Sequence, residues 1–320
     1  MGARAKRVSD LSALRERLEA LRAEWRGRRL DSDPLAFPHR YADPADREVV
    51  AFLSSSLAFG RVASIHASLE RLLSPLGPHP AAFLDAWDDG PIPELSRFVH
   101  RWVTGKDVEE FLRMVKRARR AHGSLGALFA KGEEEGNPPE GEDRSGDAVG
   151  AADADFVPVL SSFLGTLRGL SPGRAPLSRG LRFLLPSPSS GSACKRQHLF
   201  LRWMVRRDGF DLGLWTGGRF SPARLLLPMD THVHRISRYL GLTRRRSADL
   251  AASREATAAL RLLDPEDPVG YDWALSRLGI LAECTGSPAR RHCERCAVAP
   301  VCRERIGPPR RTAREKVMTT

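Results

Sequence analysis

Apolar residues recur every three or four positions along most of this chain of 320 residues. The pattern is clear in segments 47–58 and 66–73. In segment 11–28 the apolar positions are Leu11, Leu14, Leu18, Leu21 and Trp25. This spacing places apolar side chains on one face of a helix, whereas a half-buried strand needs strict alternation. No alternating run of β-branched residues is long enough to indicate a sheet, so the sequence predicts an all-α protein.

Charge is unevenly distributed along the chain. The formal net charge is +12 at pH 7, although residues 132–155 carry nine acids against a single arginine. The rest of the chain is therefore strongly basic, which is typical of proteins that bind a polyanion, and nucleic acid is the predicted partner. A coding bias towards arginine is the competing explanation. Residues 132–155 are also rich in glycine and proline, so we predict a disordered acidic insertion there.

The sequence pattern contains no segment suited to a membrane. No 18 apolar residues run together, and the N-terminus lacks the apolar core of a signal peptide. We therefore expect a monomeric cytoplasmic protein of the bacterial nucleoid, with no membrane partner.

Four of the five cysteines lie in one C-terminal run, CTGSPARRHCERCAVAPVC. They are Cys284, Cys293, Cys296 and Cys302. In a reducing cytosol such a run indicates a metal site before a set of disulfides. Four thiolates suit zinc or an iron–sulfur cluster. A structural zinc site usually has two close pairs of ligands, and this run has one, so we expect a mainly structural [4Fe–4S] cluster, with zinc as the alternative.

Asp230 follows an apolar run and a proline in the stretch LLLPMDTHVHRISRYLGL, residues 225–242. Val233, Ile236 and Leu240 recur at helical spacing, which predicts a partly buried helix that begins near Asp230. Aspartate is among the commonest N-cap residues, so a capping carboxylate is the simplest interpretation. A catalytic Asp230 would need a partner from elsewhere in the chain.

The stretch PMDTHVHRISRYLGL, followed by the cysteine run, resembles the helix-hairpin-helix DNA glycosylases of the endonuclease III type. Members of that family begin a helix with a similar segment, and their four cysteines, spaced six, two and five, hold a [4Fe–4S] cluster. The first spacing here is eight instead of six. The chain as a whole is most similar to an uncharacterised bacterial branch of this superfamily.

The resemblance implies a two-lobed glycosylase-like fold with a C-terminal cluster loop. A cluster-bearing helical domain would combine residues 10–45 with 228–308. A helical-barrel domain would combine residues 46–131 with 156–227 and would contain the hairpin-like segment. Residues 309–320 would form a basic tail.

Lys195 occupies the place of the catalytic lysine in the lyase members of this family. In SGSACKRQHLFLRWM, Gly191 precedes Lys195 as the hairpin glycine does, although serines replace the first hairpin glycine. At helical spacing, Lys195, His198, Arg202 and Arg206 would form a cationic face, opposite Leu199, Phe200 and Trp203. The expected nucleic-acid contacts are Gly191, Arg196, Arg202, Arg206 and, between the cysteine ligands, Arg290, Arg291 and Arg295.

These features together predict a DNA-repair N-glycosylase acting on damaged or abasic double-stranded DNA. Asp230 would stabilise positive charge on the sugar as the base leaves, and Lys195 would form a Schiff base that permits strand cleavage. Leu57, Phe59 and Arg61 are candidates, by position, to fill the gap left by an extruded base. The alternatives are a non-enzymatic nucleic-acid-binding protein on the same scaffold and a helical interaction protein that holds zinc.

Overall fold

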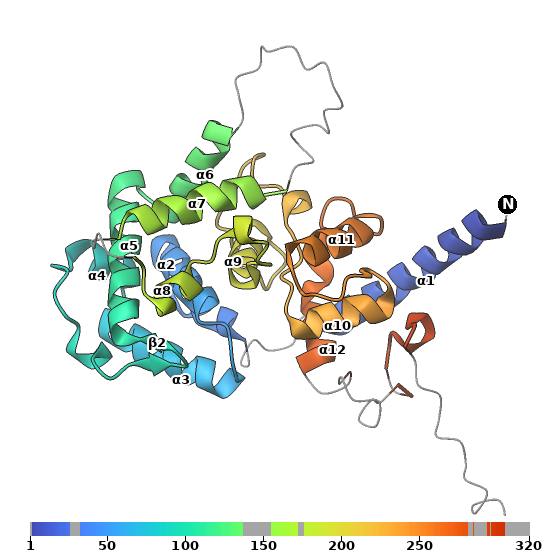
Figure 1. Cartoon of the computed structure of the whole chain (residues 1–320), viewed down its shortest axis with the longest axis horizontal. Helices are drawn as coiled ribbons and strands as arrows, with labels where there is room; N and C mark the ends of the chain where they lie inside the picture. The colour runs from blue at the N-terminus through green and yellow to red at the C-terminus, as the bar shows by residue number, and fades with distance from the viewer. Residues whose placement is uncertain are drawn as a thin grey trace, which may run out of the picture. The chain divides into compact units, whose positions relative to one another are not determined.

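The structure, a computed structural model, describes residues 2–25, 33–136, 155–171, 176–280, 284, 293–294 and 296–304. The chain divides into two compact units. The middle unit is Gly27–Pro228, and the terminal unit combines Met1–Arg26 with Met229–Thr320. Both are built mainly of helices (Figure 1), so the prediction of an all-α protein is confirmed at this level. No helix in the described ranges has the length and apolar character needed to cross a lipid bilayer.

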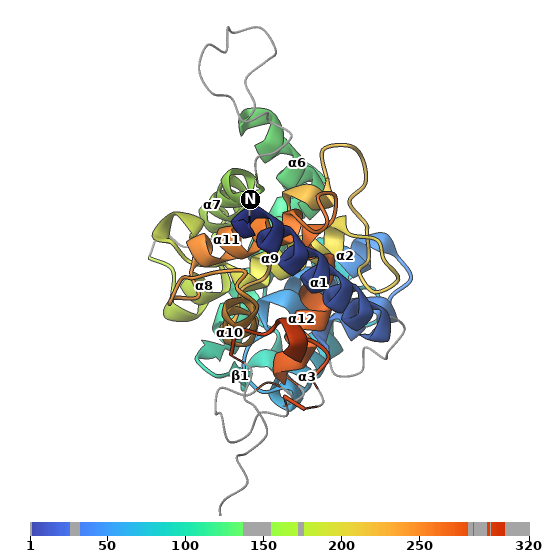
Figure 2. The same ribbon diagram turned by 90° about the vertical axis from the view of Figure 1, so that its right-hand side faces the viewer.

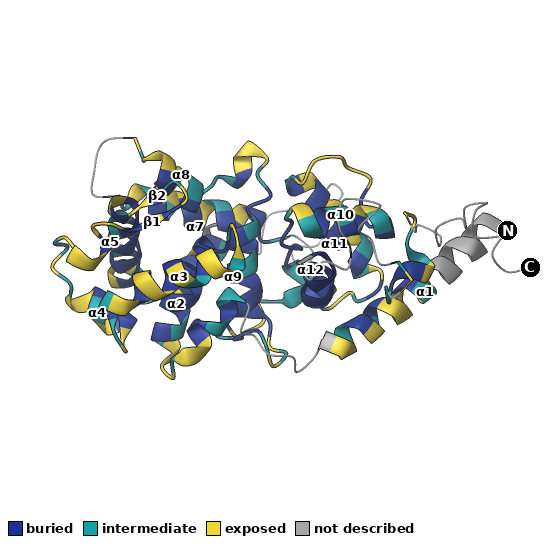
Figure 3. Cartoon of the chain, turned by 90° about the horizontal axis from the view of Figure 1, so that it is seen from below, coloured by how far each residue is buried: buried dark blue, intermediate teal, exposed yellow. Residues whose placement is uncertain are grey.

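The middle unit has its most buried helices at its centre. Its α-helices in the described ranges are α2 (Pro44–Ser56), α3 (Val62–Leu73), α4 (Pro80–Ala86), α5 (Gly105–His122), α6 (Leu125–Gly136), α7 (Val157–Gly169), α8 (Arg179–Leu184) and α9 (Lys195–Val205). Helix α2 packs against α9, and α6 packs against α7 (Figure 1). Buried residues, dark blue in Figure 3, make up most of α2 and α9, whereas α3 and α4 carry more exposed residues.

A cluster of aromatic side chains forms the core of this unit. The ring centroid of Phe52 in α2 lies 4.9 Å from that of Phe200 and 5.2 Å from that of Phe111. The ring of Phe163 meets Phe52 edge to face at 5.8 Å. Because each ring comes from a different helix, α2, α5, α7 and α9 are joined at one point. Burial of each phenylalanine stabilises the fold by about 1.5–3 kcal/mol.

A short antiparallel strand pair precedes α5. Strand β1 (Val99–His100) pairs with β2 (Val103–Thr104). Thr104 then begins α5 with a capping box, in which its side chain and that of Asp107 each accept a backbone N–H from the other end of the turn. The tight turn of the strand pair, residues 101–102, is thereby held next to the first turn of α5.

Residues 33–45 belong to the middle unit, whereas we predicted them in the cluster-bearing domain. Two 3-10 turns, η1 (Pro34–Ala36) and η2 (Pro38–Arg40), pack against α2. Leu35 and Phe37 are fully buried there. The apolar side chains of this segment therefore complete the core around α2.

The predicted acidic insertion begins later than expected. Residues 132–136 form the last turn of α6. The carboxylate of Glu133 pairs with Arg224, and Glu134 pairs with Arg219 at 2.8 Å. These ion pairs, together with helix continuity, explain why acidic residues extend an ordered helix here. At the other end of the predicted insertion, Asp155 accepts the N–H of Val157 at 3.0 Å at the start of α7. Residues 137–154 lie outside the described residues, as does the predicted basic tail.

The terminal unit brings the N-terminal helix together with the C-terminal part of the chain. Its α-helices in the described ranges are α1 (Gly2–Trp25), α10 (Thr231–Leu240), α11 (Leu250–Arg261) and α12 (Asp272–Ile280). Helix α12 packs against both α10 and α1 (Figure 2). The hydroxyl of Tyr271 donates a hydrogen bond to Glu19 at 2.7 Å, which links the two ends of the sequence. Leu18 and Leu21, two of the apolar positions noted in the sequence, are buried.

Candidate functional site

Asp230 caps the first turn of α10. Its Oδ1 atom accepts hydrogen bonds from the backbone N–H groups of His232 at 2.9 Å and Val233 at 2.8 Å. The carboxylate is half-buried and lies at the positive end of the helix, where a negative charge is stabilised. Ile236 and Leu240, like Val233, are buried. The predictions of a capping carboxylate and of a buried helix face are both confirmed.

The four cysteines of the C-terminal run line one small cavity of about 20 Å³. The cavity walls include Ile236, Tyr239 and Leu240 of α10 and Leu278 of α12. The helix that Asp230 caps therefore continues into the wall of the cysteine cavity. The cysteines that line it are Cys284, Cys293, Cys296 and Cys302, all half-buried and none in a disulfide.

Backbone and side-chain hydrogen bonds attach the cysteine run to the helices. The N–H of Cys284 donates to the carbonyl of Leu278 at 2.9 Å, and Arg235 donates to the carbonyl of Cys284 at 2.8 Å. The N–H of Arg303, just after the last cysteine, donates to the carbonyl of Tyr239 at 2.8 Å. The run is thus tied to α12 at its beginning and to α10 at its end.

The thiols are close enough to influence one another electrostatically. Burial raises the pKa of Cys296, and the charges of Cys284, Cys302 and Cys293 raise it further. Among the described residues, however, no three His, Cys, Asp or Glu side chains are gathered closely enough to hold one metal ion. The four cysteines share one cavity. The predicted cations between them, Arg290, Arg291 and Arg295, lie outside the described residues.

Lys195 begins α9, after a turn with two left-handed residues. The turn contains the 3-10 segment η6 (Pro188–Ser190) and Gly191, whose φ of +77° favours glycine. Cys194 also has a positive φ, +41°. The Nζ atom of Lys195, which is half-buried, donates to the carbonyl of Ala58 at 3.4 Å. Lys195 thus lies beside the segment that follows α2, while Asp230 belongs to the other unit.

The predicted cationic face of α9 is wrong for Arg202 and Arg206, because both are buried. Arg202 donates from Nη2 to Asp211 at 3.1 Å, and Arg206 pairs with Asp211 and, at 2.9 Å, with Asp208. Burial raises the pKa of Asp211 to about 6 even though both arginines lower it. The loop after α9 folds back over the helix, since the N–H groups of residues 212 and 213 donate to the carbonyl of Trp203. The charges are therefore neutralised internally.

Arg196, also predicted to contact nucleic acid, is buried as well, so that prediction is wrong for the same reason. Its guanidinium donates to the carbonyl of Ser56 at 2.9 Å and to that of Phe183. It lies 3.9 Å from the ring centroid of Phe183 and 5.1 Å from that of Phe59. Burial lowers its pKa to about 10, so it stays cationic at neutral pH.

Three half-buried aromatic rings meet above this arginine: Phe59 after α2, Trp102 in the strand turn, and Phe183 in α8. We refer to these three rings as the aromatic patch. The ring centroid of Phe183 lies 4.7 Å from that of Phe59 and 4.8 Å from that of Trp102. The guanidinium groups of Arg179 and Arg101, both exposed, lie 5.5 and 5.9 Å from the Trp102 ring.

Of the three rings in this patch, only Phe59 was a candidate from the sequence, and only by its position. The three rings come from segments far apart in the chain, so no local pattern joins them. One usable signal was present, because residues 97–106 contain three basic residues and no acid around Trp102. Basic residues interleaved with an aromatic residue are a feature of nucleic-acid contacts.

His100 contacts Phe59 through both its backbone carbonyl and its ring. Its Nε2 atom lies 2.9 Å from the carbonyl oxygen of Phe59, and its Nδ1 lies 2.8 Å from the hydroxyl of Ser68. The rings of His100 and Phe59 also meet edge to face at 4.4 Å. Burial lowers the pKa of His100, because its charged form is poorly solvated. The neutral imidazole suits both contacts if Nε2 donates and Nδ1 accepts.

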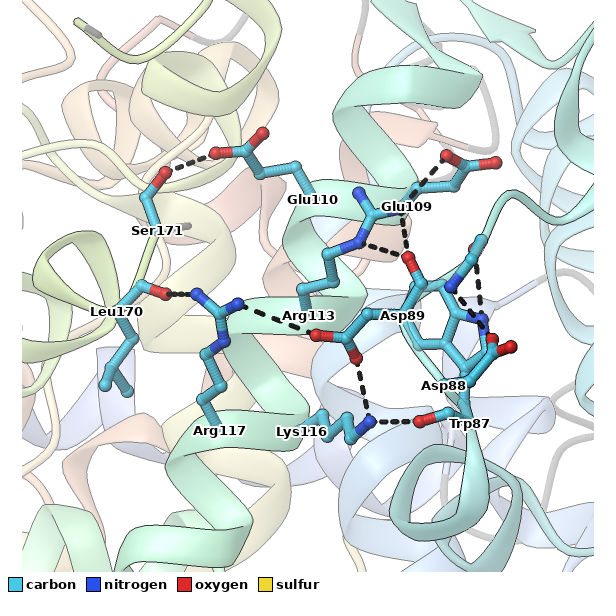
Figure 4. Close-up of polar contacts among 11 residues, drawn as sticks. Trp87, Asp88, Asp89, Glu109, Glu110, Arg113, Lys116, Arg117, Leu170 and Ser171 are labelled. Atoms are coloured by element: carbon cyan, nitrogen blue, oxygen red, sulfur yellow. Dashed lines mark hydrogen bonds and ion pairs between the residues drawn. The ribbon is translucent and has the colours of Figure 1, made fainter. Parts of the chain in front are cut away.

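A second tryptophan, Trp87, has cations beside it but in another setting (Figure 4). Lys116 of α5 donates to Asp89 at 2.8 Å and to the carbonyl of Trp87. Arg113, 5.1 Å from the Trp87 ring centroid, donates twice to the carbonyl of Asp89 at 2.9 and 3.0 Å. Arg117 lies 3.6 Å from the Asp89 carboxylate. Each of these cations is thus bound to an acid or a carbonyl.

Comparison with known proteins finds one family match. No curated protein and no solved structure is significantly similar to the chain. The matched region includes Lys195, Asp230 and the aromatic patch but ends before Cys284. Because the family model covers residues 33–281, well over half of the chain, the chain belongs to the family described as "Protein of unknown function (DUF2400)".

Proposed function

We propose that this protein is a DNA base-excision N-glycosylase with abasic-site lyase activity, of the helix-hairpin-helix type. The observation that carries the proposal is the arrangement of α10. Asp230 caps the first turn of this helix, and the other end forms a wall of the cavity lined by the four cysteines. The two motifs that resemble the endonuclease III type are therefore joined by one short helix.

Asp230 suits electrostatic catalysis. When a base leaves a nucleotide, the sugar becomes positively charged, and a fixed carboxylate nearby stabilises that transition state. Two backbone N–H groups hold Asp230 in one orientation. Such a carboxylate needs no rearrangement during the reaction, which is the physical advantage of a preorganised charge.

Lys195 suits the lyase step. Its amine, once deprotonated, would attack the anomeric carbon of the abasic sugar and form a Schiff base with loss of water. Removal of a C2′ proton would then expel the 3′ phosphate by β-elimination. Lys195 is the first residue of α9, and its side chain is half-buried. Its Nζ atom donates to the carbonyl of Ala58, just after α2, at 3.4 Å, which is a long contact that a substrate could replace.

The four cysteines would hold the cofactor. Each would supply one thiolate to a [4Fe–4S] cluster, which would stabilise the C-terminal run against α10 and α12. The four cysteines line one cavity, whose walls include residues of α10 and α12. The run has one close pair of ligands, Cys293 and Cys296, whereas a structural zinc site usually has two, so the cluster is favoured over a single zinc ion.

A non-enzymatic nucleic-acid-binding protein is the second candidate. The turn before α9 has serines at 189 and 190, where the family has a glycine, and Ser190 donates its hydroxyl to the carbonyl of Ser187. That side chain occupies part of a turn whose backbone would otherwise approach phosphate closely. Binding without chemistry would follow if the altered turn displaced the DNA from Lys195.

Borohydride trapping on duplex DNA with an abasic site tests the lyase. We expect the wild-type protein to form a covalent adduct and Lys195→Ala to form none. The matched control is Lys131→Ala, because Lys131 is an exposed lysine in α6. No adduct with the wild-type protein, at concentrations that bind the DNA fully, would contradict the lyase proposal.

Base release from DNA containing damaged bases tests Asp230. We expect Asp230→Asn to abolish release while the protein stays folded, because asparagine also caps helices well. Asp249→Asn is the matched control, since Asp249 caps α11 through the N–H of Ala252 at 2.8 Å. If the two variants lost base release to the same extent, Asp230 would be only a structural cap of its helix.

Metal analysis tests the cofactor. We expect iron and acid-labile sulfide in the purified protein, and their loss in Cys296→Ser. Cys194→Ser is the control, because Cys194 is a buried cysteine outside the cavity. Zinc without sulfide would instead identify the alternative metal.

A further inference from the structure

We propose that the aromatic patch of Phe59, Trp102 and Phe183 is a stacking site for unpaired bases of single-stranded nucleic acid. The inference rests on the proposed function only in taking nucleic acid as the ligand. It adds a substrate class, a strand with unpaired bases, and a binding site outside the two catalytic candidates.

The first support is the geometry of the rings. Each ring is half-buried, so one part is held by the protein while another remains accessible. The ring centroids of Phe59 and Trp102 lie 5.7 Å apart, and both lie under 5 Å from that of Phe183. Bases stack on aromatic side chains whatever their sequence, because every base has a π face. Three adjoining rings offer faces for more than one nucleotide.

The second support is the charge around the rings. The segments that carry the three rings, residues 59–61, 97–106 and 176–184, together contain six basic residues and no acid. All six are exposed. This composition suits a sugar–phosphate backbone that passes along the rings. The basic residues are Arg61, Arg97, Arg101, Lys106, Arg179 and Arg182.

The third support is that the charges over Trp102 are not neutralised by the protein. Within the part of the chain that the structure describes, neither Arg101 nor Arg179 forms an ion pair. The nearest acid in sequence, Asp107, is buried and is bound by Thr104 and Ser178. A phosphate would therefore gain two partially exposed guanidinium groups without breaking an existing salt bridge.

The patch is also held rigid. His100 bonds to the carbonyl of Phe59, and Arg196 lies beneath Phe59 and Phe183. Gly60, with a φ of +102°, lies so close to Arg101 that an added Cβ would be 3.2 Å from its Nε atom. Rings that are fixed before binding lose little conformational entropy when a base stacks on them.

Fluorescence anisotropy with an undamaged, labelled thymidine 15-mer tests the inference. We expect Trp102→Ala to weaken binding about tenfold, which corresponds to about 1.4 kcal/mol, within the range for stacking of one base. Trp102→Phe should stay within about threefold of the wild type, because phenylalanine keeps a π face. Trp87→Ala is the matched control and should leave the affinity unchanged. Denaturation midpoints of each variant would show that it is folded.

The salt dependence tests the arginines. Arg101→Ala combined with Arg179→Ala should lower the slope of log Kobs against log salt concentration by about 1.4, since each phosphate contact on a single strand contributes about 0.7. Equal binding by folded Trp102→Ala and wild-type protein would overturn the inference. So would equal affinity for a polyglutamate peptide of the same length, which would indicate general anion binding.

The outcome is separable from that of the proposed function, because the oligonucleotide contains no damaged base. Trp102-dependent binding in a protein that releases no base would support this inference and count against the glycosylase. If the protein releases a damaged base but binds single strands equally well without Trp102, the glycosylase proposal would be supported and this inference would be overturned.

Discussion

Trp87 and Trp102 both have cationic side chains near their rings, yet their surroundings differ in charge. Near Trp87, Lys116 and Arg117 pair with Asp89, and Arg113 is bound to a carbonyl (Figure 4). Near Trp102, the two closest arginines are exposed and have no described ion pair. A cation over an aromatic ring is thus structural where acids or carbonyls of the protein bind it, and is available to a ligand where it is exposed and has no ion pair. Arg202 and Arg206, which pair with buried Asp211, belong with Trp87 in this comparison.

The largest loss of stability is expected when the acid that neutralises the arginines is fully buried. Asp211→Ala leaves Arg202 and Arg206 buried without a full counter-charge, so the free energy of unfolding should fall by about 3–5 kcal/mol. Urea denaturation measures it. Asp208→Ala is the control and should cost less, because the side chain of Asp208 is 21 % exposed whereas that of Asp211 is 1 % exposed. A loss below about 1 kcal/mol would show that these arginines reach solvent.

A smaller effect is expected at Asp89. Asp89→Ala removes the carboxylate partner of buried Lys116, and the free energy of unfolding should fall by about 1–3 kcal/mol. The loss is smaller than at Asp211 because the side chain of Asp89 is 31 % exposed. Arg101→Ala should do the reverse, leaving stability almost unchanged and weakening single-strand binding. Should Asp89→Ala weaken binding as much as Arg101→Ala, the distinction between the two regions would fail.

The smallest effect is expected in the pH dependence of stability. The pKa of folded His100 is lowered, chiefly by burial, so the unfolded chain takes up the proton first as the pH falls below 6.5. Stability should therefore fall as the pH drops below 6.5, through the lowered folded pKa. Asp89 has a lowered pKa, first through its hydrogen bond from Lys116, so its contribution is present above pH 3.8 and is lost only as the pH falls further.

Urea denaturation across pH 3–8 separates the two regions. His100→Gln should flatten the stability curve just below pH 6.5 and leave the acid end unchanged. Asp89→Asn should flatten only the acid end. If His100→Gln left the curve unaltered near pH 6, the imidazole would be solvated and would not hold Phe59 as described.

Part of the candidate site could be predicted from the sequence because it depends on neighbours within one helical turn. Asp230 caps α10 through the N–H groups two and three residues ahead, and the apolar spacing of Val233, Ile236 and Leu240 marks its buried face. The spacing of the cysteines identified them as a set. Their position against α10 could not be predicted, because it depends on how the C-terminal run folds back.

The sequence by itself determined the helical class, the cap at Asp230 and the grouping of the four cysteines, since each follows from local spacing and local hydrogen bonds. Only the tertiary structure decided which cations are available. Helical periodicity places Arg202 and Arg206 on one face of α9, but whether that face meets water or Asp211 depends on the loop that follows. Likewise, the patch around Trp102 exists only because three distant segments meet. Whether a cation is neutralised or exposed depends on residues that are near it in space but distant from it in sequence.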